Sequence, residues 1–285
     1  MSTGMQATKG DDWASLAEDY AAMTAKPSLP PIKVMLSRAN ALKPFSEATG
    51  ILDNGCGPGP VMQQLIQVYG TTIPADCTLT CSDFSAGMVA QVQAAKDRNT
   101  ASDPSSPWKR VQTKVQDATD LTEIASESLS HLTAGLVYFL TPSPEKCLSE
   151  SLRVLQPSGV LAVSAWKDTQ WIHLMYTLTR IRPDKIMPTM PEAWTSTTGL
   201  KGEMEKAGFR DVETHEVEVE MEYKTYRGLA DFMVGKLPHM IALTKDMSAE
   251  QVEKYKEIWI EDMKKMCGSE PGSLSGVALV GVGRK

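Results

Sequence analysis

The hydrophobic positions of the chain follow two periods, and their alternation predicts the order of strands and helices. Between residues 50 and 166, short apolar runs alternate with segments in which apolar residues recur every three or four positions. Short apolar runs predict buried strands, whereas the longer repeat predicts helices with one buried face. This alternation is typical of a parallel sheet whose faces are covered by helices.

The predicted elements continue to the end of the sequence, although the rhythm changes after residue 166. Strands are predicted at residues 50–53, 77–82, 111–115, 131–136, 160–165, 212–223 and 276–283. Helices are predicted at residues 60–68, 86–96, 146–155, 200–207 and 226–268, and a turn-rich loop at residues 99–107. Residues 11–48 also have helical spacing, but Pro27, Pro30 and Pro31 predict a break between two helices.

Length and composition are those of a globular chain, with 285 residues, 42% hydrophobic and 22% charged. These values exclude a fully disordered chain and a fibrous protein. The net charge of -6 argues against nucleic acid and an anionic membrane surface as partners. The five cysteines contain no CxxC pair, so we expect reduced thiols and no metal site. The sequence has neither a signal-peptide stretch nor an apolar run of about 20 residues, which predicts a soluble, cytoplasmic protein.

A glycine-rich turn is the most informative motif. Gly55, Gly57 and Gly59 follow a strand that ends in Asp53, and Pro60 suits the first position of the next helix. Glycines let a backbone approach a ligand closely, and the helix N-terminus offers free N–H groups. The turn therefore predicts a nucleotide-like cofactor. Pro60 occupies the third position of the dinucleotide fingerprint, and the Gly-Lys-Ser/Thr of a phosphate-binding loop is absent.

Four stretches together resemble the motifs of class I S-adenosylmethionine-dependent methyltransferases. DNGCGPG at residues 53–59 resembles the first motif, TCSDFSAGM at 80–88 the second, VQDA at 115–118 the third, and LQPSGVL at 155–161 the turn before strand five. Within the family, the sequence looks most like ubiquinone/menaquinone-type and secondary-metabolite enzymes. The resemblance implies an α/β, Rossmann-like, doubly wound, mostly parallel seven-stranded sheet with helical lid insertions.

The resemblance also implies a division of the chain into a core and a cover. We expect a single domain overall, composed of an N-terminal helical cap (1–48), an S-adenosylmethionine-binding core (49–166), substrate lid insertions (167–199 and 224–275) and remaining core elements (200–223 and 276–285). In similar enzymes such insertions form a lid together with the N-terminal helices. A monomer or a homodimer is expected.

The motif residues have side chains that suit particular groups of the cofactor. Asp83 can accept hydrogen bonds from both ribose hydroxyls, and Phe84 can lie against the adenine face beside Met88. Asp117 can accept from the adenine amine while the Ala118 amide donates to a ring nitrogen. The predicted cofactor-binding set is Tyr20, Asp53, Asn54, Gly55, Cys56, Gly57, Gly59, Asp83, Phe84, Met88, Asp117, Ala118, Thr133 and Ala134.

Alternatives remain for several of these residues. Asp53 either balances the cofactor's ammonium group or is a structural acid at a strand end. Tyr20 either touches the cofactor's carboxylate, as in similar enzymes, or is a core tyrosine. Strand four, LSHLTAG, lacks the acid that is usual there, and no Asn/Asp-Pro-Pro-Tyr/Phe follows it. The absence of that motif argues against nucleic-acid and translation-factor substrates.

Candidate catalytic and substrate residues lie in the segments outside the core pattern. His173 and His239 are the candidate general bases, although each can also be a surface or packed histidine. We expect His131 to be structural and His215 to face solvent. An apolar pocket for a hydrophobic or aromatic small molecule is predicted from Trp171, Met187, Trp194, Met233, Leu237 and Met240, which can instead form a second small core.

The leading functional hypothesis is methyl transfer from S-adenosylmethionine to an apolar or aromatic small molecule in secondary metabolism. Oxygen is slightly favoured over nitrogen or carbon as the acceptor atom. The alternative is a methyltransferase-like enzyme that binds the cofactor but catalyses a cyclisation, decarboxylation or pericyclic rearrangement. A third hypothesis is a non-catalytic binding protein, against which the intact glycine turn, Asp83 and Asp117 argue.

Overall fold

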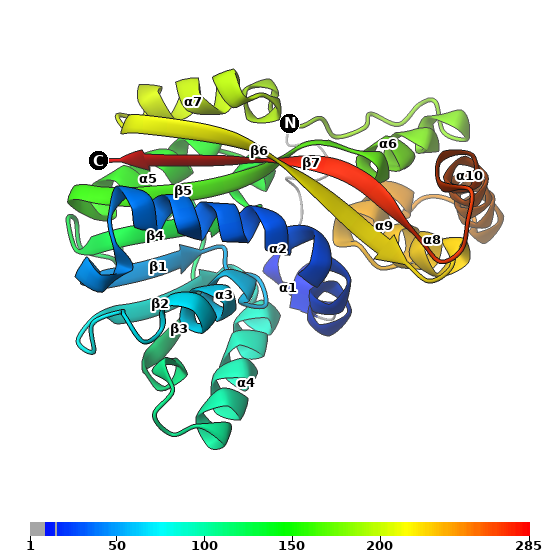
Figure 1. Ribbon diagram of the computed structural model, residues 1–285. Coiled ribbons are helices and arrows are strands. Elements are labelled where there is room, and N and C mark those ends of the chain that lie inside the picture. The colour runs from blue at the N-terminus through cyan, green and yellow to red at the C-terminus, as the bar shows by residue number, and fades with distance from the viewer. Residues whose placement is uncertain (1–8, 15) are drawn as a thin grey trace.

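A seven-stranded sheet forms the centre of the computed structural model, which describes residues 9–14 and 16–285 (Figure 1). Residues 1–8 and 15, part of the predicted N-terminal cap, lie outside the described residues. The strands are β1 (Gly50–Asn54), β2 (Thr78–Asp83), β3 (Val111–Val115), β4 (Leu129–Gly135), β5 (Leu155–Thr169), β6 (Arg210–Tyr223) and β7 (Gly272–Arg284). Their order is β3-β2-β1-β4-β5-β7-β6, and β7 runs antiparallel to both of its neighbours. The predicted α/β, mostly parallel seven-stranded sheet is confirmed.

The helices lie between and beyond the strands. They are α1 (Gly10–Ala14), α2 (Ala17–Leu42), α3 (Pro60–Tyr69), α4 (Ala86–Ser102), α5 (Pro144–Val154), α6 (Gln170–Tyr176), α7 (Thr197–Lys206), α8 (Tyr226–Gly235), α9 (Pro238–Thr244) and α10 (Ala249–Cys267). Short 3-10 turns include η4 (Tyr138–Leu140) and η6 (Glu192–Thr195). Of the helices in the described part of the chain, none combines the length and the apolar character needed to cross a membrane.

Two separate cores cover the two faces of the sheet. Successive side chains of a strand point to opposite faces, so Ile51 packs with α2 and α3 while Leu52 packs with α5 and α7. The same alternation sends Val160 to the first face and Leu161 to the second. This arrangement explains why β1 and β4 are buried along nearly their whole length, as strands covered on both faces are.

The structure corrects two of the predicted helix boundaries. Helix α2 is continuous through Pro27, Pro30 and Pro31, where we expected a break. Pro27 and Pro31 are buried, and α2 packs along β5, β6 and β7, so tertiary packing offsets the missing hydrogen bonds. Helix α4 continues to Ser102, so the predicted loop at residues 99–107 begins only after that residue.

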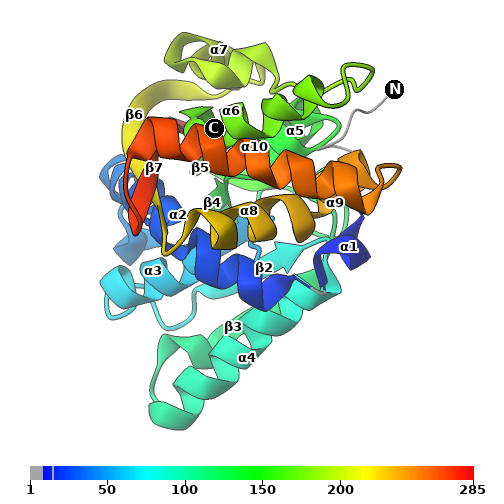
Figure 2. The ribbon, with the colours of Figure 1, turned by 90° about the vertical axis from the view of Figure 1, so that its right-hand side faces the viewer.

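A third core lies beyond the carboxyl ends of the parallel strands. The distal parts of β6 and β7 extend past the rest of the sheet and pack with α6, α8, α9 and α10 (Figures 1 and 2). The hydroxyl of Tyr255 on α10 donates to the carbonyl of Met175 on α6 at 2.7 Å. This core holds the helices of the predicted lid segments over the same edge of the sheet at which the glycine turn lies.

Candidate functional site

The glycine turn lies at the carboxyl end of β1, where ligands bind in open α/β sheets. The backbone N–H groups of Gly55 and Cys56 both donate to the carbonyl of Ser82 at 2.8 Å. The Gly57 N–H donates to Oδ2 of Asp83 at 2.8 Å, and the Ser85 N–H donates to Oδ1 of the same carboxylate at 2.9 Å. Asp83 therefore joins the glycine turn after β1 to the helix start after β2.

The conformations of the glycines show why this turn needs them. Gly55, Gly57 and Gly59 have φ values of 71°, 52° and 91°, a region that side chains disfavour. A Cβ on Gly55 would lie 2.4 Å from Val137 Cγ2, so glycine allows the two segments to approach. A Cβ on Gly57 would meet no atom within 4 Å. The turn at Gly57 therefore has open space beside it, with room for a ligand.

Asp53 is a buried carboxyl group with one oxygen that accepts no hydrogen bond within the part of the chain that the structure describes. Thr133 Oγ1 donates to Asp53 Oδ1 at 2.9 Å, but Oδ2 has no hydrogen-bond partner among the described residues. Burial raises the pKa of Asp53 to about 7, the hydrogen bond from Thr133 opposes this shift, and the charge of Asp83 adds to it. An unpartnered buried carboxylate oxygen suits a cationic group of a ligand.

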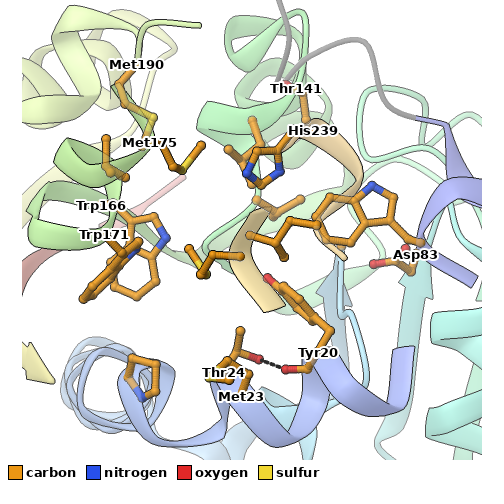
Figure 3. Close-up of a pocket in the computed structure, with 18 of the residues that line it drawn as sticks. Tyr20, Met23, Thr24, Asp83, Thr141, Trp166, Trp171, Met175, Met190 and His239 are labelled. Carbon is orange, nitrogen blue, oxygen red and sulfur yellow. Dashed lines mark hydrogen bonds between the residues drawn. The ribbon is translucent and has the colours of Figure 1, made fainter. Parts of the chain in front are cut away.

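A cavity of about 300 Å³ extends from Asp83 into the predicted lid (Figure 3). Asp83, Phe84 and Asp117 line one end, at the carboxyl ends of β2 and β3. Trp166 and Trp171 line the other end, with ring centroids 5.3 Å apart and planes nearly perpendicular. The further apolar lining residues at that end are Ile172, Met175, Met190, Met221, Phe232, Met233 and Leu237.

His239 and Tyr20 lie in the wall between the two ends. His239 is on α9, and burial lowers the pKa of its imidazole to about 4, so the ring is neutral at pH 7 and can accept a proton. Tyr20 is on α2, and burial together with the charge of Asp83 raises the pKa of its phenol to about 12. Trp13 of α1 contacts both rings, with centroid separations of 6.4 Å to His239 and 5.3 Å to Tyr20.

The structure brings many of the predicted residues to one cavity. Of the predicted cofactor set, the lining residues are Tyr20, Gly55, Asp83, Phe84, Asp117 and Ala118. Of the predicted substrate and catalytic sets, they are Trp171, Met233, Leu237 and His239. The cavity therefore joins the motif residues to lid residues that are far away in sequence.

Four residues of the predicted catalytic and substrate sets do not line this cavity. The exposed His173 lies with Nε2 2.7 Å from Oδ1 of Asp168, because it is on the outer side of α6. Trp194 is buried under α7, and its ring centroid lies 6.4 Å from that of Tyr138. Met240 is fully buried in the third core, and Met187 packs against the same core from outside. These positions correct the substrate-side prediction: Trp194 and Met240 are core residues, and His173 faces solvent.

Several members of the predicted cofactor set lie behind the lining residues. The Nδ2 group of Asn54 donates to the carbonyl of Ala118 and to the Tyr138 hydroxyl, so it connects three loops of the site. Thr133 reaches the site through Asp53, as described above. Cys56 and Ala134 are buried in the two cores that cover the sheet, and Met88 is buried as well. These side chains therefore hold the shape of the site.

Other lining residues were missed by the sequence analysis. They include Trp13, Met23, Thr24, Pro27, Val137, Leu140, Thr141 and Pro142. The stretch from Val137 to Pro142 directly follows β4, and the rule that ligands lie at the carboxyl ends of parallel strands points to it. For α1 and the first turns of α2, where the resemblance points only to Tyr20, the sequence contains no comparable local signal, because their position over the cavity results from tertiary packing.

Known proteins resemble the chain in both sequence and fold. The family described as "Methyltransferase domain" matches residues 52–163. Methyltransferase ucsB of Acremonium sp is 38% identical over 275 residues, which cover 96% of this chain and 95% of that protein. Acetylaranotin bis-thiomethyltransferase of Aspergillus terreus is 28% identical over 168 residues, covering 56% of this chain and 53% of its own. Phosphoethanolamine N-methyltransferase 2 of Haemonchus contortus, solved with S-adenosyl-L-methionine, covers 98% of this chain and 60% of its own, with 13% identity and a TM-score of 0.53.

Proposed function

The chain belongs to the class I S-adenosylmethionine-dependent methyltransferases, and from this premise we propose that it methylates an oxygen of an apolar or aromatic small molecule. Its cofactor is S-adenosylmethionine, which when bound supplies a methyl group activated by a positively charged sulfur. The observation that carries the proposal is the single cavity that joins Asp83 at one end to Trp166 and Trp171 at the other.

The residues at the carboxyl ends of β1, β2 and β3 fit this cofactor, and we call this part of the site the cofactor end. The unpartnered Oδ2 of Asp53 suits the ammonium group, and the open space beside Gly57 leaves room for the ligand backbone. Asp83 keeps further lone pairs for the ribose hydroxyls, because each carboxylate oxygen accepts more than one hydrogen bond. We assign the adenine ring to Phe84, a half-exposed aromatic residue on the wall, and its amine to Asp117.

The opposite end of the cavity, around Trp166 and Trp171, is called the lid end, and its residues support an apolar or aromatic acceptor. Tryptophan and methionine dominate its wall, and both offer apolar surface that adapts to flat rings. Holding the acceptor in line with the methyl–sulfur bond supplies much of the rate enhancement in reactions of this kind. The fungal relatives support a place in secondary metabolism, since one of them is named for acetylaranotin.

His239 is the proposed general base. Its imidazole lies on the cavity wall between the two ends and is uncharged at pH 7, as a general base must be, while the burial that lowers its pKa makes it a weaker base than a free imidazole. An acceptor hydroxyl placed there can transfer its proton to the ring as its oxygen takes the methyl group. An acceptor oxygen is therefore favoured over a basic amine, which is a nucleophile as soon as it is uncharged and needs no such base in the transfer step.

Mass spectrometry tests the proposal directly. The protein is incubated with S-adenosylmethionine carrying a labelled methyl group and a panel of aromatic hydroxyl compounds. We expect a product heavier by one CH2 unit, with the label on oxygen. A product that is an isomer of its substrate, or that has lost carbon dioxide, would overturn methyl transfer and support a non-methylating enzyme that binds the same cofactor.

A further inference from the structure

The charges around the cavity are distributed unevenly. Among the described residues that line it, the groups charged at neutral pH are Asp83 and Asp117, both at the cofactor end. No lysine or arginine occurs in that described wall. The end formed by Trp166, Trp171 and Met190 therefore presents rings, thioethers and alkyl groups.

Five basic residues of the lid segments form ion pairs away from the cavity. Arg180 pairs with Asp262 at 2.7 Å, and Lys256 pairs with Asp231 at 2.7 Å. Lys236, at the end of α8, forms an ion pair with Asp19 on α2. Arg182 and Lys185 both pair with Asp246, at 3.2 and 2.5 Å. These cations bind the lid segments to each other and to α2, so they are not directed at an acceptor.

The polar groups near the lid end are few and partly used. Thr141 Oγ1 donates its hydrogen to the carbonyl of Tyr138 at 2.8 Å, so toward a ligand it can only accept a hydrogen bond. The polar side chains next to this end are the phenol of Tyr20 and the imidazole of His239, which lie in the wall between the two ends and are both uncharged at pH 7. A ligand with one hydroxyl finds a hydrogen-bond partner at these rings, whereas a ligand with a fixed charge finds no opposite charge.

We propose that the lid end of the cavity binds its acceptor as an uncharged aromatic molecule and discriminates against both carboxylate and ammonium groups. This inference rests on the proposed function and names the charge class of its substrate. An anion would be buried without a cationic partner, which is strongly unfavourable. A cation would be attracted by the aromatic faces, but no carboxylate neutralises it at that end, and it would lie beside the cofactor's own positive charge.

Three probes with the same ring system test the inference. 2-Naphthol, 2-naphthoate and 2-naphthyltrimethylammonium are titrated by calorimetry at pH 7 into the protein saturated with sinefungin, a cofactor analogue that carries a charged amine in place of the sulfonium. We expect 2-naphthol to bind at least tenfold more tightly than either charged probe. A preference smaller than tenfold over either of them would overturn the inference.

A pair of variants then tests whether the missing charge causes the selectivity. Met190→Lys places an ammonium on the cavity wall, and Met187→Lys places one in the same segment but away from the wall. We expect Met190→Lys to raise the affinity for 2-naphthoate at least tenfold and Met187→Lys to leave it unchanged. Equal behaviour of the two variants would contradict the assignment. Circular dichroism checks that both fold, and the wild-type titrations stand without them.

The outcomes separate this inference from the proposed function. If no panel compound is methylated but 2-naphthol keeps its preference, the proposed reaction fails and the charge selectivity stands. If the enzyme methylates a carboxylate or a charged amine efficiently, methyl transfer stands and the charge selectivity fails.

Discussion

The two ends of the cavity are constructed in different ways. At the cofactor end, backbone N–H groups and carboxylates from the ends of β1 and β2 form short hydrogen bonds, such as the 2.8 Å bond from Gly57 to Asp83. At the lid end, side chains from α2, β5, α6, β6, α8 and α9 meet through apolar contact. The first end is suited to one ligand with fixed groups. The second is a surface whose residues can change without disturbing the sheet, so acceptor specificity can diverge while the cofactor stays the same.

Replacing His239 gives the largest effect if the lid end contributes to the chemistry. We expect His239→Ala to lower kcat by about 100-fold or more, because the acceptor hydroxyl loses its proton acceptor. Cofactor affinity should not change. The matched control is His173→Ala, since His173 faces solvent beside Asp168. The measurement is the rate of S-adenosylhomocysteine release. Equal rates for the two variants would show that His239 is not the general base.

Replacing Asp83 affects the cofactor end alone. Asp83→Ala removes the acceptor of two backbone hydrogen bonds as well as the proposed ribose contact. We expect the cofactor dissociation constant to rise by about 100-fold, measured by calorimetry. Asp103→Ala is the control, because Asp103 also accepts from a backbone N–H at 2.9 Å but lies in the exposed loop after α4. An unchanged dissociation constant in Asp83→Ala would overturn the cofactor site.

Filling the open space beside Gly57 tests the same end by a different route. Gly57→Val adds a side chain where φ is 52° and where no protein atom lies within 4 Å. We expect cofactor affinity to fall by about 30-fold through backbone strain and exclusion of the ligand. Gly202→Val, in α7 with similar open space, should leave it unchanged. Equal affinities for the two variants would place the cofactor elsewhere.

The unpartnered acid predicts a pH dependence at the cofactor end. The pKa of Asp53 is raised to about 7, so in the free protein about a tenth of it is ionised at pH 6 and about nine-tenths at pH 8. The cofactor's ammonium group favours the carboxylate, so affinity should increase about tenfold from pH 6 to pH 8. His239 stays neutral across this range, because its pKa is lowered to about 4.

Calorimetric titrations at several pH values measure this dependence. Asp53→Asn serves as the control, because its amide cannot ionise. We expect the variant to bind more weakly and with a flat pH profile between pH 6 and 8. A wild-type profile that is equally flat would show that Asp53 does not contact the ammonium group.

The smallest expected effect separates the lid wall from the core beneath it. Trp171→Phe reduces the aromatic surface at the wall, so the affinity for 2-naphthol should fall by about threefold. Trp194→Phe should leave that affinity unchanged but lower the free energy of unfolding by about 1–2 kcal/mol, because Trp194 is buried against Tyr138. Similar probe affinities in both variants would contradict the assignment of Trp171 to the wall.

The sequence marks the cofactor end more clearly than the lid end, for a physical reason. The turn from Asp53 to Gly59 is local, and the glycines at positive φ and the strand-end acids mark it within a few residues. The lid wall depends on which side of a helix faces inward. Trp171 and His173 are two positions apart on α6, which places them about 200° apart around the helix axis. One therefore lines the cavity and the other faces solvent.

Composition could not make that distinction either. Met233 lines the cavity and Met240 is fully buried behind it, although both are methionines of the same lid segment. Pro27 is another example, because a residue that normally interrupts helices lies inside α2, where packing against the sheet determines the conformation. For such residues the outcome depends on contacts between distant parts of the chain, which no local pattern contains.

The position of β7 has a consequence for synthesis of the protein on the ribosome. β7 (Gly272–Arg284) lies between β5 and β6 and pairs with both along nearly its whole length. A growing chain that has produced β6 therefore has no neighbouring strand to receive it until residues 272–284 emerge. Until then, the exposed edges of β5 and β6 are open to pairing with other chains. Translation that stops just before residue 272 would yield a product with a cofactor motif but an unfinished sheet.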